Sequence, residues 1–152
     1  MKGILLLVIS AVFFLCGCSA SAEEGITVHN AWMRPTAQGQ NGAVYFVLQN
    51  HSATTDELVS ASSHVAESVE IHESSMVEGT DVMQMKQIFS VPLDRGSETI
   101  FDPGGLHVML VNVNRGLAMG ENIELTLHFK NYDDLLVTVS VAEFAPADEH
   151  AH

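Results

Sequence analysis

The chain has 152 residues, with 19 Asp or Glu against 6 Lys or Arg and a formal net charge of −13. This length is enough for one domain with a hydrophobic core. The acidic balance argues against nucleic acid or anionic lipid head groups as charge-driven partners. We interpret the acidic surface mainly as a source of solubility; attraction of cations or of a basic partner is the alternative.

The N-terminus has the pattern of an export signal. One positive charge at Lys2 precedes an apolar stretch over residues 3–15, which is too short to cross a bilayer comfortably. The stretch ends in Leu-Cys-Gly-Cys, which resembles a bacterial lipoprotein signal in which Cys18 becomes the lipidated first residue of the mature chain. The alternative is an ordinary signal peptide cleaved near Ala20 or Ala22.

The lipoprotein interpretation divides the start of the chain into two segments. Residues 1–17 would be the signal peptide, and residues 18–25 would be the lipidated cysteine with a short, small and polar tether. We therefore expect an exported protein of the periplasm or cell envelope, held at a membrane by its lipid. Cys16 would leave with the signal, so the mature chain would have no disulfide and no free thiol. A blue-copper centre needs a thiolate and is therefore excluded.

From Ile26 onward the pattern is that of β-strands. Apolar residues are dense over residues 44–48 and 108–113, and they alternate with polar residues over 123–129 and 135–141. Turn-forming residues punctuate these runs at 78–81, 94–97, 102–105, 114–116 and 120–122. No segment shows an apolar stripe at helical spacing. We predict one domain over residues 26–144, an antiparallel β-sandwich of seven to nine strands, followed by a disordered acidic and His-containing tail over 145–152.

Four soft or borderline metal ligands lie on the predicted strands. His107 and Met109 project from one face of their strand, about 7 Å apart, while Val108 projects from the other. His72 points away from the core if Ile71 faces it. Thioether sulfur and imidazole nitrogen together suit Cu(I). With Met83, these residues make copper binding the leading hypothesis.

Other residues remain as alternatives. A methionine often only fills a core, and Met85 or Met76 could take the place of Met83 or act as an auxiliary ligand. His107 could instead cap a turn. We expect His29, His51 and His64 to be structural, His128 to be solvated, and Trp32 to belong to the core. His150 and His152 form a His-x-His in the tail that is an alternative, weak Cu(II) site.

The spacing of the four ligands resembles that of the periplasmic copper chaperone family PCuA(C). That family has a His, ten residues, a Met, twenty-odd residues and then His-x-Met. Here His72 and Met83 enclose ten residues, and Met83 and His107 enclose twenty-three. The turn and strand over 103–110 and the Ala-Trp-Met-Arg-Pro run over 31–35 support the resemblance, which covers about residues 26–144. It implies a cupredoxin-like, Greek-key β-sandwich and a Cu(I) ion held by His72, Met83, His107 and Met109.

The resemblance also implies a role. The expected function is delivery of Cu(I) for assembly of the copper centre of cytochrome c oxidase, with a Sco-type protein and oxidase subunit II as partners. Alternatives are a copper buffer or tolerance protein with no dedicated acceptor, and a metal-free structural or adhesive lipoprotein domain. The sequence contains no recognisable catalytic constellation, so we expect no enzymatic activity.

Overall fold

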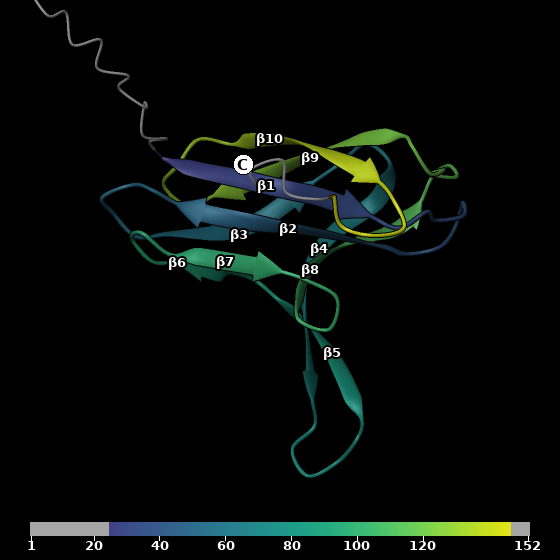
Figure 1. The fold of residues 1–152 in the computed structure, drawn as a ribbon, viewed down its shortest axis with the longest axis horizontal. Coiled ribbons are helices and arrows are strands. Elements are labelled where there is room, and N and C mark those ends of the chain that lie inside the picture. Colours follow the sequence, from purple (N-terminus) through teal and green to yellow (C-terminus); the bar gives the residue numbers. More distant parts are fainter. Residues whose placement is uncertain (1–24, 147–152) are drawn as a thin grey trace, which may run out of the picture.

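A computed structural model describes residues 25–146, which form ten β-strands and no helix (Figure 1). No helix long and apolar enough to cross a membrane occurs within that range. The predicted signal peptide, nearly all of the tether, and residues 147–152 of the predicted tail lie outside the described residues. The strands are β1 (Ile26–Met33), β2 (Gly42–Asn50), β3 (Asp56–Ser62), β4 (Ala66–Met76), β5 (Met83–Ile88), β6 (Val91–Leu93), β7 (Glu98–Phe101), β8 (Leu106–Val113), β9 (Asn122–Phe129) and β10 (Leu135–Val141).

All ten strands belong to one continuous sheet. Their order is β5-β4-β8-β7-β2-β1-β10-β9-β3-β6, with an additional pairing between β8 and β2. Neighbours are antiparallel except for the β1–β10 and β7–β8 pairs, which are parallel. The sheet folds over on itself, so that β3 and β4 also approach each other and apolar side chains from both halves form a single core.

The core follows from the alternation seen in the sequence. Along β9 and β10, residues of one parity are buried, and along β2 every second residue from Gly42 to Asn50 is buried. Phe46 and Phe101 stack at the centre with ring centroids 4.3 Å apart. The predicted all-β fold class is therefore confirmed.

The predicted number of strands was too low. The structure has ten strands in residues 25–146, and the short ones are β6 with three residues and β7 with four. A strand this short completes at most two cycles of alternation, so a sequence pattern cannot distinguish it from a loop. Both pair with longer strands, which supply the hydrogen-bond partners that define them.

The β4–β5 hairpin projects from the body of the sandwich (Figure 1). In β4, Ile71 is buried in the core, while the neighbouring His72 lies on the opposite, outer face of the sheet. In β8, Val108 and Leu110 are buried in the core, so His107 and Met109 lie on the outer face. The strands thus present their polar and thioether side chains where the hairpin leaves the sandwich.

Candidate metal centre

The two candidate histidines face each other across adjacent strands. His72 of β4 and His107 of β8 are directly paired in the antiparallel ladder, so their side chains leave the sheet on the same face. Their ring centroids are 5.7 Å apart, with an angle of 52° between the planes. This separation is short enough for one ion with metal–nitrogen bonds of about 2.0–2.1 Å to lie between the two rings.

Each of these histidines has one ring nitrogen engaged and the other free. His72 Nε2 lies 2.7 Å from Glu70 Oε2, and His107 Nδ1 lies 3.1 Å from the carbonyl oxygen of Gly105. Carboxylate and carbonyl oxygens only accept, so both engaged nitrogens donate and carry the proton. His72 Nδ1 and His107 Nε2 therefore present lone pairs, and both are buried with no hydrogen-bond partner.

Buried polar atoms normally find a partner, so this pair of unpartnered nitrogens calls for an explanation. His128, in contrast, has both ring nitrogens engaged: Nε2 with Ser62 Oγ at 2.9 Å and Nδ1 with Asp134 Oδ2 at 2.9 Å. His128 is thus partly buried and bonded, where the sequence led us to expect a solvated side chain. The partner of a metal-ligating histidine is characteristically a carboxylate or a backbone carbonyl. His72 has a carboxylate partner, Glu70, and His107 has a backbone carbonyl partner, that of Gly105.

Met109 and Glu70 complete the outer face beside the histidines. Met109 is two residues beyond His107 in β8 and is directly paired with Glu70. Met109 is half-buried. Its flexible thioether side chain can therefore adapt to a bound ion and is still accessible from the surface. Glu70 places a carboxylate next to a site whose four candidate ligands carry no negative charge. A single positive charge bound there would be compensated in part by this carboxylate.

The other methionine of the four candidate ligands, Met83, is on the projecting hairpin. Met83 is paired with Met76, four residues from His72 along β4, whereas Met85 is paired with Ser74, only two residues from His72. The backbone register therefore places Met85 nearer to His72. However, the side chain of Met83 turns toward the loop before β8, where its methyl carbon would lie 4.0 Å from a Cβ atom at Gly104.

The register also shows that all these methionines share the outer face with the histidines. Paired residues in an antiparallel ladder project on the same side. Met76, Met83 and Met85 therefore lie on the face that carries His72. All three are about half exposed. No group of three His, Cys, Asp or Glu side chains that could hold a metal ion occurs within residues 25–146.

Sequence reasoning missed an aromatic side chain at the site. Tyr45 of β2 lies against His107, with ring centroids 6.4 Å apart, and Trp32 of β1 lies against Tyr45 at 5.1 Å. Trp32 is buried, as expected. Its ring neighbours that of Tyr45, which in turn neighbours the ring of His107. No local signal identifies Tyr45, because only the pairing of β2 with β8 brings it to the site. Glu70 had a signal, since its alternation with His72 places both on one face.

Burial favours the neutral forms of two side chains at the site, His107 and Tyr45. Desolvation lowers the pKa of His107, against the hydrogen bond to Gly105, and nearby His72 lowers it further. Burial also raises the pKa of the Tyr45 phenol. The charge of Arg34 lowers this pKa, and the charge of Asp102 raises it. His107 therefore keeps its lone pair available at neutral pH, and Tyr45 stays a neutral hydroxyl there.

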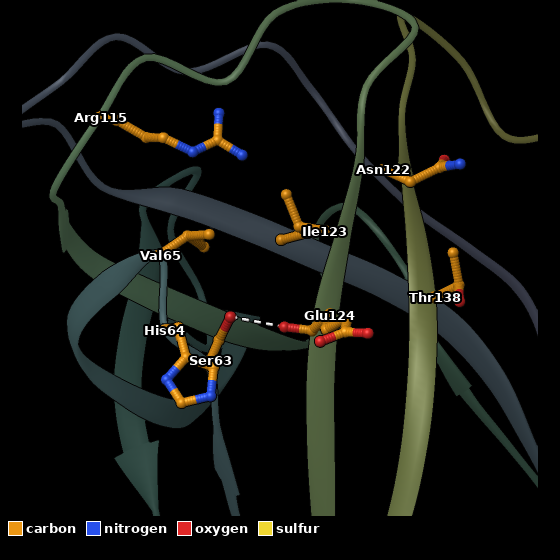
Figure 2. Close-up of a pocket in the computed structure, with 8 residues that line it drawn as sticks. All are labelled: Ser63, His64, Val65, Arg115, Asn122, Ile123, Glu124 and Thr138. Atoms are coloured by element: carbon orange, nitrogen blue, oxygen red, sulfur yellow. Dashed lines mark hydrogen bonds between the residues drawn. The ribbon is translucent and has the colours of Figure 1, made fainter.

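Figure 2 shows a separate pocket, lined by residues of β9 and β10, of the segment between β3 and β4, and of the loop after β8. Its lining includes His64, Arg115 and Glu124, and Ser63 Oγ donates to the Glu124 carbonyl oxygen at 2.6 Å. The Arg115 guanidinium is already paired with Glu121 at 3.0 Å, so the pocket has no free cationic group there. His107 is near the start of β8, and the loop that carries Arg115 follows the end of this strand, which runs about 20 Å from His107 to Val113. The candidate ligands His150 and His152 and the lipidation site Cys18 lie outside the described residues.

Comparison with known families matches residues 26–141, from the first strand to the last, to the family described as "Putative lipoprotein LpqE-like". The chain belongs to this family. A relative in Leifsonia xyli subsp. xyli, named "Putative lipoprotein Lxx21020", is 32% identical over 147 residues, which cover 90% of this chain and 87% of the relative. A second, "Uncharacterized protein RP573" of Rickettsia prowazekii, is 30% identical and covers 82% of this chain and 71% of the relative.

Solved structures with a similar fold include PCuAC domains. The chain of this LpqE-like protein resembles the "Copper-bound PCuAC domain from PmoF2" with a TM-score of 0.64 and 23% identity, covering 82% of this chain and 97% of that domain. It also resembles the structure titled "Solution structure of CuI-DR1885 from Deinococcus Radiodurans", with a TM-score of 0.60, 25% identity and 83% coverage of each chain. The resemblance to PCuA(C) noted from the sequence is thus supported at the level of the fold.

Proposed function

We propose that this LpqE-like protein is an exported copper chaperone that binds one Cu(I) ion through His72, Met83, His107 and Met109. The observation that carries the proposal is the pair of buried, unpartnered imidazole nitrogens on His72 and His107, which are directly paired across β4 and β8 with ring centroids 5.7 Å apart. A fold shared with a protein whose structure is titled as a Cu(I) form supports the choice of metal. Two thioethers and two neutral imidazoles favour Cu(I) over Zn(II), which takes thiolate, imidazole and carboxylate ligands.

The site is arranged for transfer rather than for storage. The His72 side chain is 16% exposed and Met83 is 51% exposed, so an incoming donor or acceptor can reach the ion from the outer face. Ligands can then be exchanged one at a time, and Cu(I) keeps its charge throughout. We propose that the acceptor is the copper centre of cytochrome c oxidase subunit II, reached with a Sco-type protein, and that lipidation at Cys18 holds the chaperone in the cell envelope.

Anaerobic titration with Cu(I) against a competing chelator tests the binding site. We expect one tightly bound Cu(I) per chain. Alanine at any of His72, His107, Met83 or Met109 should weaken binding by about tenfold or more, equivalent to about 1.4 kcal/mol or more. Met119→Ala is the matched control, because Met119 is exposed and outside the site.

Two other outcomes would change the proposal. A larger loss of Cu(I) affinity in Met85→Ala than in Met83→Ala would make Met85 the ligand in place of Met83, as the backbone register favours. Equal or tighter binding of Zn(II) at the same residues would remove the Cu(I) assignment. Oxidase activity in a deletion strain, with and without added copper, separates dedicated delivery from buffering, because a buffer would leave oxidase assembly intact at ordinary copper levels.

A further inference from the structure

The β4–β5 hairpin exposes three methionines that the core does not use. Met76 is 55% exposed, Met83 is 51% exposed and Met85 is 52% exposed. Leaving apolar surface in water forgoes about 25 cal/mol for each Å² that burial would remove. Packing therefore does not explain these side chains, whereas Met33 is fully buried and fills the core.

The strand register gathers the three thioethers on one face. Met76 is directly opposite Met83, which places their Cβ atoms about 4.5–5.5 Å apart. Met85 follows Met83 on the same face, about 7 Å further along β5. Three flexible side chains rooted at these distances can bring their sulfur atoms to a common point above the hairpin. Three thioethers are a donor set that selects Cu(I).

The cluster also adjoins the proposed imidazole site. Along β4, the outer-face residues run from Met76 through Ser74 to His72, and Ser74 is the partner of Met85. Ser74 also donates its backbone N–H to the Gly105 carbonyl at 3.0 Å, the same carbonyl that accepts from His107 Nδ1. The hairpin is thus fixed to the loop that orients His107, and the cluster of three methionines lies beside the two histidines.

We propose that Met76, Met83 and Met85 form a thioether-only capture site for Cu(I), from which the ion passes to His72 and His107. This inference rests on the proposed function. In the transfer, Cu(I) exchanges its bonds to Met76 and Met85 for bonds to His72 Nδ1 and His107 Nε2 and gains a bond to the Met109 sulfur, while Met83 stays bound. No electron is transferred, thioether sulfur has no proton to release, and each imidazole binds through the nitrogen opposite the one that donates to Glu70 or Gly105.

Methionine methyl NMR of the double variant His72→Ala/His107→Ala tests the capture site in isolation. Ag(I), a monovalent soft ion that does not change oxidation state in the experiment, serves as the probe. The methyl signals of Met76, Met83 and Met85 should shift together on addition of Ag(I). The signals of buried Met33 and of exposed, isolated Met119 should stay in place. Binding should be unchanged between about pH 7 and 5, because no ligand titrates.

The added substitutions Met76→Leu and Met85→Leu should abolish Ag(I) binding by the double variant. Leucine conserves apolar character on an exposed strand, and circular dichroism checks that the fold is kept. In the chain with both histidines, the same two leucines should slow Cu(I) uptake several-fold and change the equilibrium affinity little.

The two proposals fail differently. If the unaltered protein binds Cu(I) but the His72→Ala/His107→Ala variant leaves all methionine methyls unshifted, the capture site is wrong and the imidazole site stands. If that variant binds Cu(I) as tightly as the unaltered protein, the capture site stands and the His2Met2 site is wrong. If the unaltered protein binds no Cu(I), both are wrong.

Discussion

Glu70 and the Gly105 carbonyl decide which nitrogen each histidine offers. A neutral histidine has a proton on one ring nitrogen and a lone pair on the other. To bind a metal ion, the lone pair must be on the nitrogen that faces the ion. The Glu70 carboxylate holds the proton on His72 Nε2, and the Gly105 carbonyl holds it on His107 Nδ1. The outcome is a pair of lone pairs fixed in advance, so that binding an ion does not require the rings to flip.

Glu70→Gln should lower Cu(I) affinity about tenfold, at the lower end of the usual effect of losing such an orienting partner. The amide keeps the shape of the side chain but loses the negative charge that compensates the ion. Glu73→Gln is the matched control, because Glu73 is on the opposite face of β4 and pairs with Lys86. Competition titration at neutral pH measures both. Equal affinity in Glu70→Gln and unaltered protein would contradict the role.

At the scale of the element, the loop before β8 sets the geometry of the site. It contains Gly104, whose φ of +94° is costly for residues with a side chain, and Gly105, whose carbonyl accepts from both His107 and Ser74. A change in this loop would displace the Gly105 carbonyl, which accepts hydrogen bonds from residues of both β4 and β8. The hairpin tip has a glycine of similar conformation, Gly79 with φ +77°, with no neighbouring atom within 4 Å of an added Cβ.

Gly104→Ala and Gly79→Ala should each cost about 1–2 kcal/mol of folding free energy, because both force a side chain into the left-handed region. Only Gly104→Ala should also weaken Cu(I) binding, since only its loop carries the Gly105 carbonyl. Urea unfolding and competition titration of the two variants make the comparison. A similar loss of Cu(I) affinity in Gly79→Ala would mean that general destabilisation, rather than loop geometry, controls the site.

The elements also show how far sequence reasoning reaches. Alternation of apolar and polar residues predicted the strands around Val44 and Ile123 and the face on which His107 and Met109 lie, because that information is local. The pairing of strands is long-range, so the proximity of Tyr45 to His107 and the choice between Met83 and Met85 had no local signal. Spacing alone proposed Met83, whereas register places Met85 nearer to His72.

At the scale of the whole molecule, the buried imidazole links stability to pH. Burial lowers the pKa of His107 in the folded protein below its value of about 6.5 in an unfolded chain. Between these two values the unfolded chain takes up a proton that the folded protein resists. The contribution of His107 to stability is therefore fully present above about pH 6.5 and is lost as the pH falls toward the folded pKa.

Urea unfolding of the metal-free protein between pH 7.5 and 5 measures this effect. The difference in unfolding free energy between unaltered protein and His107→Gln should shrink as the pH falls, by at most about 1.4 kcal/mol per pH unit. The subtraction removes the contribution of the other histidines, which both proteins share. A difference that is constant across this range would show that His107 titrates as it does in an unfolded chain.

The end position of β5 in the sheet has a consequence for the behaviour of the protein in bulk. One side of this strand has no neighbour, and its unpaired backbone groups lie beside exposed apolar side chains, a combination that invites strand-to-strand aggregation between copies. The strand is only six residues long and carries Lys86, and a net charge of −13 repels approaching copies. Salt shortens that repulsion to a range of about 10 Å at 0.1 M. We therefore expect the acidity of the protein to help keep it dispersed, and its tendency to aggregate to rise with ionic strength.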